Sequence, residues 1–419
     1  MKRKVLWLCH VQFSEDNIKQ TGAWLQPLAE RLVSSGSIEI GVIAPGTGNT
    51  IIKTQVNGIH QWLIPIKNTR GYGQCASNET SRIVSDIINE YCPDIVHIWG
   101  TESIWASIYA NGYINCKTII DIQGLLYDYS FYYYGQMSFI EIIKSFHLKE
   151  MIMPWRSLPY KKYIFKKRGT FEQQYLSSFA NISTQSQWVR DHLRFTFPNA
   201  KLFKTRILLR NQFYTCSQWQ YREVSDSPVI FSTCSAAVTY KGMHTAIKAL
   251  NVLVNKYPNV KLRLAGRIDV GGKLLDGYSI FLRKLIKKYK LEDNVEYLGS
   301  IDALEIIRQL QNCNVCLIPS FIETYCLAFA ESMIVGVPTV VSYAGAMPEQ
   351  AKDEEEALFY NPFDYVTAAA HIDRVVSNKL LSEKLSDNAR KRKFIDNDPQ
   401  IVVNTQIEIY NYICNNGND

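Results

Sequence analysis

The sequence predicts an α/β fold of two doubly wound, Rossmann-like domains that face a shared cleft. Its 419 residues exceed one ordinary core and suit two domains of about 150 to 200 residues. Short apolar runs alternate with amphipathic helical patterns, and this alternation starts again at Val229. Parallel strands end at a common sheet edge, so ligand-binding residues are expected directly after strands.

The first domain is expected at residues 1–210. Its predicted strands are short apolar runs bounded by turn residues, as in a parallel sheet covered on both faces: VLWLC, IEIGVIA, a strand near Trp62, PDIVHIW and TIIDI. The run VLWLCHV follows three basic residues, but it is short, contains His10 and lacks a small-residue cleavage site. We therefore interpret it as the first buried strand and not as an export signal.

The second domain is expected at residues 227–400, with strands at VIFSTC, KLRLAG, VEYLG and VCLIP. Residues 211–226 are polar, aromatic and aperiodic, which predicts an interdomain linker. A last helix over 401–419 either stays with this domain or crosses back to the first.

Ten cysteines without paired spacings indicate reduced thiols in a cytoplasmic protein. The one CxxC, Cys313 to Cys316, lies across the start of a strand, where residues three apart point to opposite faces. We expect both to be buried and no metal to be bound. No apolar run approaches the roughly 18 residues that span a bilayer.

The turn after VCLIPS carries the residues that point to chemistry. Glu323 lies in this turn, and Glu331 is expected on the following helix. Backbone N–H groups of the first helical turn form a site for diphosphate oxygens, assisted by the helix dipole. A carboxylate before or after this helical turn can accept hydrogen bonds from sugar hydroxyls, so the spacing of the two glutamates suits a nucleotide sugar. Two glutamates eight apart also occur on solvated helix faces, and the context decides between these interpretations.

The runs ETYCLAFAE, GVPTVV and GAMPE resemble the signature of the retaining family 4 glycosyltransferases, which have the GT-B fold and belong to the group 1 glycosyl transferases. VEYLG, NVCLIPS and YKGMHTAIKAL are similar to further landmarks of this family, in the same order. In the N-terminal half the resemblance is looser, in TGAWLQPLAERL, PDIVHIWG and ISTQSQWVRDHL.

The resemblance implies that Glu331 binds the ribose, that Glu323 binds hydroxyls of the donor sugar and that Lys241 pairs with a donor phosphate. Outside this context Lys241 would be an ordinary exposed lysine before a helix. The resemblance also implies backbone contacts to the diphosphate and sugar from Thr324, Tyr325, Cys326 and Leu327.

Further positions follow from the same resemblance. Gly22 corresponds to a glycine that lets backbone approach a phosphate, although an ordinary turn glycine fits equally, and Ser300 lies where the family holds the base. Ala236 replaces a phosphate-binding arginine, for which Arg267 could substitute unless it is merely a surface residue. Gln123 replaces a histidine that faces the donor sugar; it can hydrogen-bond but cannot transfer a proton.

For such an enzyme the resemblance implies metal-independent, front-face transfer with retention, in which the leaving diphosphate deprotonates the acceptor. The expected catalytic residues are Glu323, Lys241 and Gln123. No cofactor is expected beyond the nucleotide sugar, most simply a UDP-sugar. The acceptor is expected to be a saccharide or lipid-linked saccharide of surface polysaccharide biosynthesis.

Residues 127–168 are rich in aromatic residues and, from Glu141 to Arg168, hold eight basic and two acidic residues. They could form a peripheral membrane face for anionic headgroups, a groove for sugar rings, or part of the domain's packing. Nucleic acid is not an expected partner, because no recognition fold or second basic region accompanies them.

Two other classes of function remain. Ala236 and Gln123 would suit a degenerate sugar-binding or partner subunit, which the retained Glu323, Lys241 and Glu331 argue against. An isomerase or phosphorylase could use a similar scaffold, since fold alone does not fix chemistry.

Overall fold

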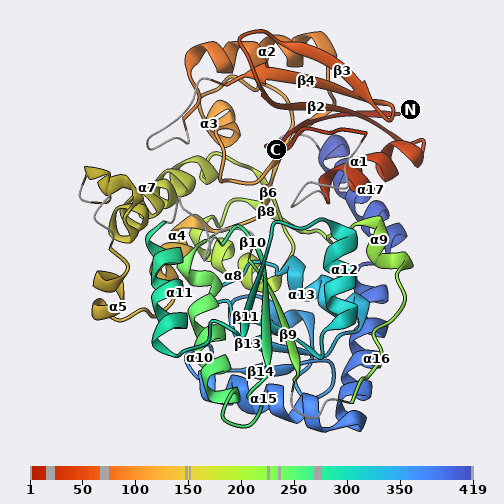
Figure 1. Ribbon diagram of the computed structural model, residues 1–419. Coiled ribbons are helices and arrows are strands. Elements are labelled where there is room, and N and C mark those ends of the chain that lie inside the picture. Colours follow the sequence, from red (N-terminus) through yellow and green to blue (C-terminus); the bar gives the residue numbers. More distant parts are fainter. Residues whose placement is uncertain are drawn as a thin grey trace. The chain divides into compact units, whose positions relative to one another are not determined.

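The computed structural model describes residues 2–15, 24–66, 75–146, 150, 152–223, 227–234, 237–268 and 276–416. The chain forms two compact units (Figure 1). The N-terminal unit comprises residues 1–130, 164–208 and 397–419, and the C-terminal unit comprises residues 131–163 and 209–396. Each is an α/β unit with one largely parallel sheet, as the predicted fold class of two doubly wound domains requires.

The sheet of the N-terminal unit has the strand order β3-β4-β2-β1-β5-β6-β7-β8. All pairings are parallel except that of β3 with β4. The strands are β1 (Arg3–Leu8), β2 (Ile38–Gly46), β3 (Ile52–Val56), β4 (Ile59–Pro65), β5 (Ile95–Trp99), β6 (Thr118–Ile122), β7 (Asn181–Thr184) and β8 (Lys201–Lys204).

Helices cover both faces of this sheet, which explains the uninterrupted apolar runs of β1, β5 and β6. On one face, Tyr410 of the last helix accepts a hydrogen bond from Trp7 Nε1 at 3.0 Å. The helices are α1 (Leu25–Ser34), α2 (Asn78–Tyr91), α3 (Trp105–Ala110), α8 (Gln187–Thr196) and α17 (Pro399–Asn415), with α4 (Leu126–Tyr132) and α7 (Leu158–Leu176) containing residues of both units.

The sheet of the C-terminal unit is parallel throughout, with the order β11-β10-β9-β12-β13-β14. Its strands are β9 (Val229–Cys234), β10 (Lys261–Gly266), β11 (Val295–Gly299), β12 (Val315–Ile318), β13 (Thr339–Ser342) and β14 (Leu358–Tyr360). The chain order reverses between β9 and β12, and the loops that follow these two strands meet at this point.

One face of this sheet packs against α10 (Met243–Leu253), α11 (Gly277–Lys288) and α15 (Tyr365–Ser377). The other face packs against α9 (Asn211–Thr215), α12 (Ala303–Asn312), α13 (Leu327–Val335) and α16 (Lys379–Asp396). The short elements are α5 (Phe139–Lys144), η2 (Pro154–Arg156), η3 (Thr239–Lys241) and α14 (Met347–Gln350).

Two expected boundaries need correction. Residues 131–163 belong to the C-terminal unit and not to a first domain of residues 1–210, because Met137 and Leu158 are buried in the core beside α10 and α11. The expected linker at 211–226 is packed where it is described: Phe213 is buried, and Trp219 Nε1 donates to the Cys313 carbonyl at 2.7 Å. Of the helix expected over 401–419, residues 401–415 form part of α17, which lies in the N-terminal unit.

Cys313 and Cys316 are both buried, as small apolar residues are. In the part of the chain that the structure describes, no helix is both long and apolar enough to span a bilayer.

Candidate functional site

The loop that carries Lys241 is fixed against the end of β12. Gly242 has a φ of +72°, and a Cβ atom there would lie 1.9 Å from the carbonyl oxygen of Pro319. The N–H of Phe321 donates to the carbonyl of Tyr240 at 2.7 Å. Only glycine allows this close approach, which brings the Lys241 side chain to the turn that carries Glu323.

Glu323 is almost fully buried in this turn and makes two polar contacts through one oxygen. Lys241 Nζ and Ser320 Oγ each lie 2.7 Å from Glu323 Oε1. Neither contact uses Oε2. The Glu323 carbonyl accepts from the N–H of Ala346 at 2.8 Å, so the loop before α14 fixes the backbone of this turn. The structure thus brings together two of the predicted catalytic residues.

Helix α13 begins directly after this turn. Cys326 stands at its N-cap, where Ser, Thr, Asp and Asn are preferred, and its thiol is only a weak acceptor. The N–H groups of the first turn, at Leu327 and beyond, therefore lack a strong side-chain cap and are suited to an anion. Thr324 and Cys326 are buried, while Tyr325 and Leu327 are half-buried.

Glu331 lies on α13, one turn beyond that N-terminus, and is held by an arginine that the sequence did not reveal. Arg210 donates to Glu331 Oε1 from Nε at 3.1 Å and from Nη2 at 2.7 Å. Burial raises the pKa of the Glu331 carboxyl, and the Arg210 guanidinium opposes this shift. The guanidinium carbon of Arg210 lies 4.9 Å from the ring centre of Phe213. This pair fixes the position of the Glu331 carboxylate.

Ser300 and Arg267 follow β11 and β10, respectively, at the same edge of the sheet as Glu323. Both are exposed. Gly266, before Arg267, has a φ of +123°, and a Cβ atom there would lie 1.7 Å from the Cys234 carbonyl oxygen. The turn that presents Arg267 therefore needs glycine.

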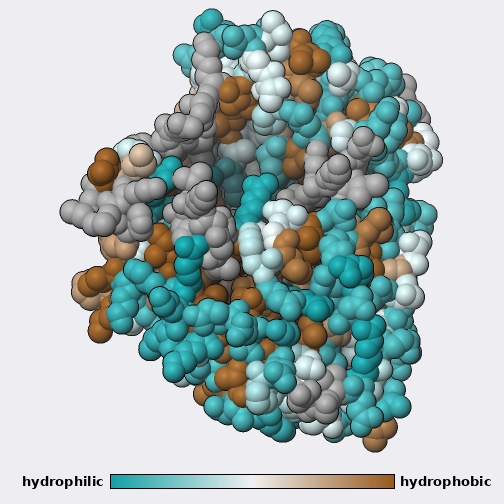
Figure 2. All heavy atoms as spheres, viewed as in Figure 1, coloured by the Kyte–Doolittle hydropathy of each residue, from teal (hydrophilic) through white to brown (hydrophobic). Residues whose placement is uncertain are grey.

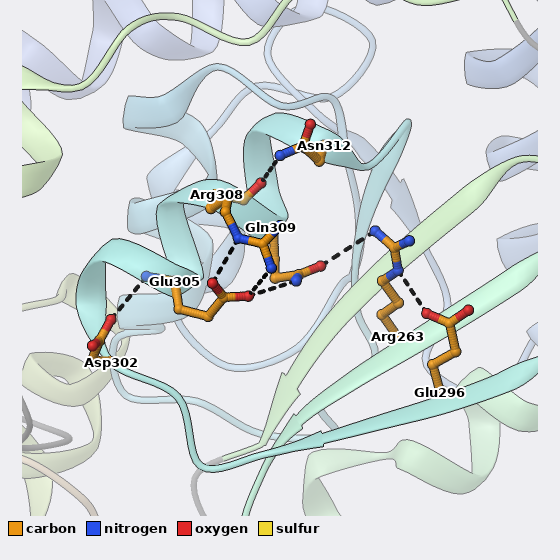
Figure 3. Close-up of polar contacts among 7 residues, drawn as sticks. All are labelled: Arg263, Glu296, Asp302, Glu305, Arg308, Gln309 and Asn312. Carbon is orange, nitrogen blue, oxygen red and sulfur yellow. Dashed lines mark hydrogen bonds and ion pairs between the residues drawn. The ribbon is translucent and has the colours of Figure 1, made fainter.

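A polar network connects β10, β11 and α12 (Figure 3). Arg263 on β10 donates to Glu296 Oε2 on β11 at 2.8 Å and to Gln309 Oε1 on α12 at 3.4 Å. Figure 3 shows Gln309 pointing from α12 toward Arg263. The network also includes Asp302, which caps α12, and the helix residues Glu305, Arg308 and Asn312. It ties β10 to β11 and to α12, the strand and helix between which Ser300 lies.

Gln123 belongs to the N-terminal unit, where it follows β6. A Cβ atom at Gly100 would lie 3.3 Å from Gln123 Oε1 and 2.5 Å from Glu102 Oε2, so both side chains crowd the end of β5. Burial raises the pKa of Glu102, raises that of Asp121 to about 7 and raises that of Glu172 to about 8. These buried acids were not predicted from the sequence. The one signal for them was Asp121, an acidic residue inside the apolar run TIIDI.

Gly22 and the substituted position Ala236 lie outside the described residues. Among the residues that are described, no group of three or more His, Cys, Asp or Glu side chains is placed to hold a metal ion.

Comparison with known families identifies residues 217–392 as a match to the family described as glycosyl transferases group 1. This confirms the group 1 part of the resemblance found in the sequence. The chain is 29% identical over 180 residues to an uncharacterized glycosyltransferase, YqgM, of Bacillus subtilis, covering 43% of this chain and 48% of that protein. It is 21% identical over 192 residues to the capsular polysaccharide biosynthesis glycosyltransferase CapM of Staphylococcus aureus, covering 46% and 48%. The matches thus span about half the length of each relative.

The fold resembles solved glycosyltransferase structures over nearly the whole chain. Sucrose-phosphate synthase from Thermosynechococcus elongatus has a TM-score of 0.71 at 14% identity, covering 98% of both chains. HepE from Anabaena, in complex with UDP-glucose, has a TM-score of 0.65 at 14% identity, covering 98% of this chain and 100% of that one. Likeness at this level of identity establishes the fold.

Proposed function

We propose that this chain, whose residues 217–392 belong to the glycosyl transferases of group 1, transfers a sugar from a nucleotide diphosphate donor to a saccharide or lipid-linked saccharide. The observation that carries the proposal is the α13 N-terminus in the C-terminal unit. A buried glutamate precedes it, another follows it, and Lys241 lies at the first of them.

Each donor group has a matching protein group in the C-terminal unit. The diphosphate accepts hydrogen bonds from the first turn of α13 and pairs with Lys241, with Arg267 as a second cation from the same sheet edge. Glu331 accepts hydrogen bonds from the ribose hydroxyls, and Glu323 accepts hydrogen bonds from hydroxyls of the transferred sugar. The loop at Ser300 receives the base. A UDP-sugar is the donor we favour, supported by the UDP-glucose complex of the structurally similar HepE.

Gln123, in the N-terminal unit, is proposed to hydrogen-bond to a sugar hydroxyl. A glutamine amide donates and accepts but does not exchange protons, so it orients the sugar without acting as acid or base. The reaction therefore relies on electrostatic support of the leaving group.

In the proposed reaction the acceptor oxygen bonds to the anomeric carbon as the bond from that carbon to the diphosphate breaks. The acceptor proton passes to a diphosphate oxygen on the same face, so the anomeric configuration is retained and no metal or protein nucleophile is used. The N–H groups of α13 and the Lys241 ammonium stabilise the negative charge of the diphosphate as it leaves.

The test is a panel of UDP- and GDP-sugars, assayed for binding and for release of free nucleotide with and without saccharide or lipid-linked acceptors. We expect one donor to bind and to release its nucleotide slowly to water and faster with the right acceptor. NMR of the product should show the anomeric configuration of the donor. Inversion would contradict the front-face mechanism.

The second candidate is a partner subunit that binds nucleotide sugar without turnover, favoured by Gln123 and Ala236. Tight donor binding without nucleotide release for any acceptor would support it. A role in surface polysaccharide assembly, supported by the likeness to CapM, is tested by extending polysaccharide precursors in the same assay.

A further inference from the structure

Helix α5 in the C-terminal unit exposes the residues that a surface helix ordinarily buries. Phe139, Ile140 and Ile143 are 76%, 62% and 51% exposed. Its acidic residue, Glu141, instead faces the unit and accepts a hydrogen bond from Lys248 of α10 at 2.8 Å. An amphipathic helix on a globular surface normally turns its apolar side to the core, so this orientation leaves an apolar face without a partner among the described residues.

The chain segment that follows α5 exposes further large apolar side chains. Phe146, Ile152 and Trp155 are also exposed, the last two at 78% and 56%. We call these six residues the α5 surface: Phe139, Ile140, Ile143, Phe146, Ile152 and Trp155. In Figure 2 hydrophobic atoms gather at the lower left of the view, where Figure 1 places α5. Clustered exposed apolar residues mark an interaction site more often than scattered ones do.

The α5 surface is held in place by the rest of the unit. A capping box between Ser138 and Glu141 starts the helix, and Lys284 Nζ of α11 donates to the carbonyl of Lys144 at 2.7 Å. Before the helix, the Gly135 carbonyl accepts from Nε2 of the buried His244 at 2.7 Å. These contacts fix α5 on the C-terminal unit with its apolar side chains exposed.

Exposed basic side chains lie on the same segment and on the neighbouring helix α11. Lys144 ends α5 and Arg156 ends η2, and both are exposed. Helix α11, next to α5, exposes four more cations: Arg283, Lys284, Lys287 and Lys288. The nearby acids are engaged or covered, because Glu141 is paired with Lys248 and Glu150 is buried. Apolar side chains with cations nearby match a lipid surface that carries negative headgroups.

We propose that the α5 surface docks the C-terminal unit on an anionic lipid bilayer, with its apolar side chains among the headgroups and these cations on the phosphates. A second copy of the chain fits this surface less well, since the positive charges of the two copies would repel each other. The inference deepens the proposed function, because a lipid-linked acceptor is presented at a membrane.

The test is sedimentation of the full chain with phosphatidylcholine vesicles that contain or lack phosphatidylglycerol. We expect binding only to the anionic vesicles and weaker binding as salt is added. The double variant I140D/I143D should bind at least about tenfold more weakly, because two apolar side chains that the bilayer would bury are then replaced by charged ones. The control is L380D/I395D, which changes two equally apolar residues of α16 that are 80% and 59% exposed. It should bind as the wild type does.

Charge is tested separately with K144E/R156E, for which we expect roughly a fivefold loss of binding for each cation removed, against K391E as control. The inference is overturned if the wild type ignores anionic vesicles, or if I140D/I143D and L380D/I395D bind alike. It is also overturned if the wild type is a dimer that I140D/I143D converts to monomers, because the surface would then join two copies. Nucleotide binding, measured without vesicles, reports on the proposed function independently.

Discussion

Arg210 and Glu331 are 121 residues apart in the chain and form a two-bond ion pair, with Nε and Nη2 of the arginine both on Oε1 of the glutamate. Both side chains are largely buried, at 12% and 13% exposure. Burial raises the pKa of the Glu331 carboxyl, and the Arg210 guanidinium opposes that rise. In the proposed site the ion pair means that the Glu331 side chain is already held in position before the donor arrives.

Replacing Glu331 by glutamine should weaken binding of the donor nucleotide. A hydrogen bond to a charged group contributes about 1.5 to 3 kcal/mol, so the dissociation constant should rise roughly ten- to a hundredfold. Isothermal titration with UDP measures this directly. Arg210→Lys keeps the positive charge but loses the two-bond geometry, and it should fall between the wild type and Glu331→Gln.

Replacing Lys241 by alanine should slow nucleotide release more than it weakens donor binding. The ammonium is proposed to stabilise charge that develops as the diphosphate leaves, and loss of one such donor costs about 3 kcal/mol of transition-state stabilisation. We therefore expect kcat to fall by two orders of magnitude or more, measured as nucleotide released with acceptor present. Lys256, whose exposed ammonium pairs with Asp373 at 2.5 Å, gives the control Lys256→Ala, which should leave kcat unchanged.

The two variants together test where the site lies. If Glu331→Gln and Lys241→Ala both bind the donor as the wild type does, the donor does not bind at α13. If donor binding is weakened but kcat of Lys241→Ala equals that of the wild type, the donor does bind at α13. Lys241 then does not stabilise the leaving diphosphate.

Gly135 joins residues 131–163 to the loop that carries Lys241. Its φ is +53°, and a Cβ atom there would lie 2.4 Å from the Thr239 carbonyl oxygen. Gly135→Ala should therefore push this loop away and weaken donor binding as well as stability. Gly112 is the matched control, with a φ of +77° and open space around it, so Gly112→Ala carries only the backbone strain of about 1 kcal/mol.

Thermal unfolding and UDP titration of both glycine variants separate these effects. We expect Gly135→Ala to lower the unfolding midpoint further than Gly112→Ala and to be the variant with weaker UDP binding. Equal results for the two would mean that contact with Thr239 does not position the loop.

The parallel strands and the α13 turn could be predicted from the sequence because both depend on local pattern. Strands covered on both faces appear as short apolar runs such as TIIDI, and a glutamate just past VCLIPS falls at the ligand-binding edge of a sheet. The edge strand β3 was missed because four of its five residues are exposed, so no apolar run marks it.

Long-range contacts could not be predicted, since no local pattern encodes them. Arg210 looked like the last residue before a linker, yet it pairs with Glu331. The aromatic residues after Tyr127 looked like part of the first domain, yet Met137 completes the core of the C-terminal unit. In both cases the partner lies about a hundred residues further along the chain.

Lys393 offers a prediction for stability, because it is a lysine at 1% exposure in the C-terminal unit. Burial lowers the pKa of Lys393 to about 8, although Asp396, 3.6 Å away, opposes the shift. In unfolded chains the pKa of lysine is about 10.4. Between these values the unfolded state binds more protons than the folded state, so the free energy of unfolding should rise as pH increases from about 8 to about 10.4.

Lys393→Met should remove this rise and should stabilise the protein at pH 7, where the wild type holds a buried charge. The side chains are similar in length, and Asp396 keeps its ion pair with Arg392 Nε at 3.1 Å, so no new unpaired acid is created. The expected gain at pH 7 is about 1 to 3 kcal/mol, seen as a higher midpoint of thermal unfolding. The exposed neighbour Lys391 supplies the control Lys391→Met, which should follow the wild type at every pH. A Lys393→Met variant that is less stable at pH 7 would instead mean that the ammonium makes a net favourable contribution where it is buried.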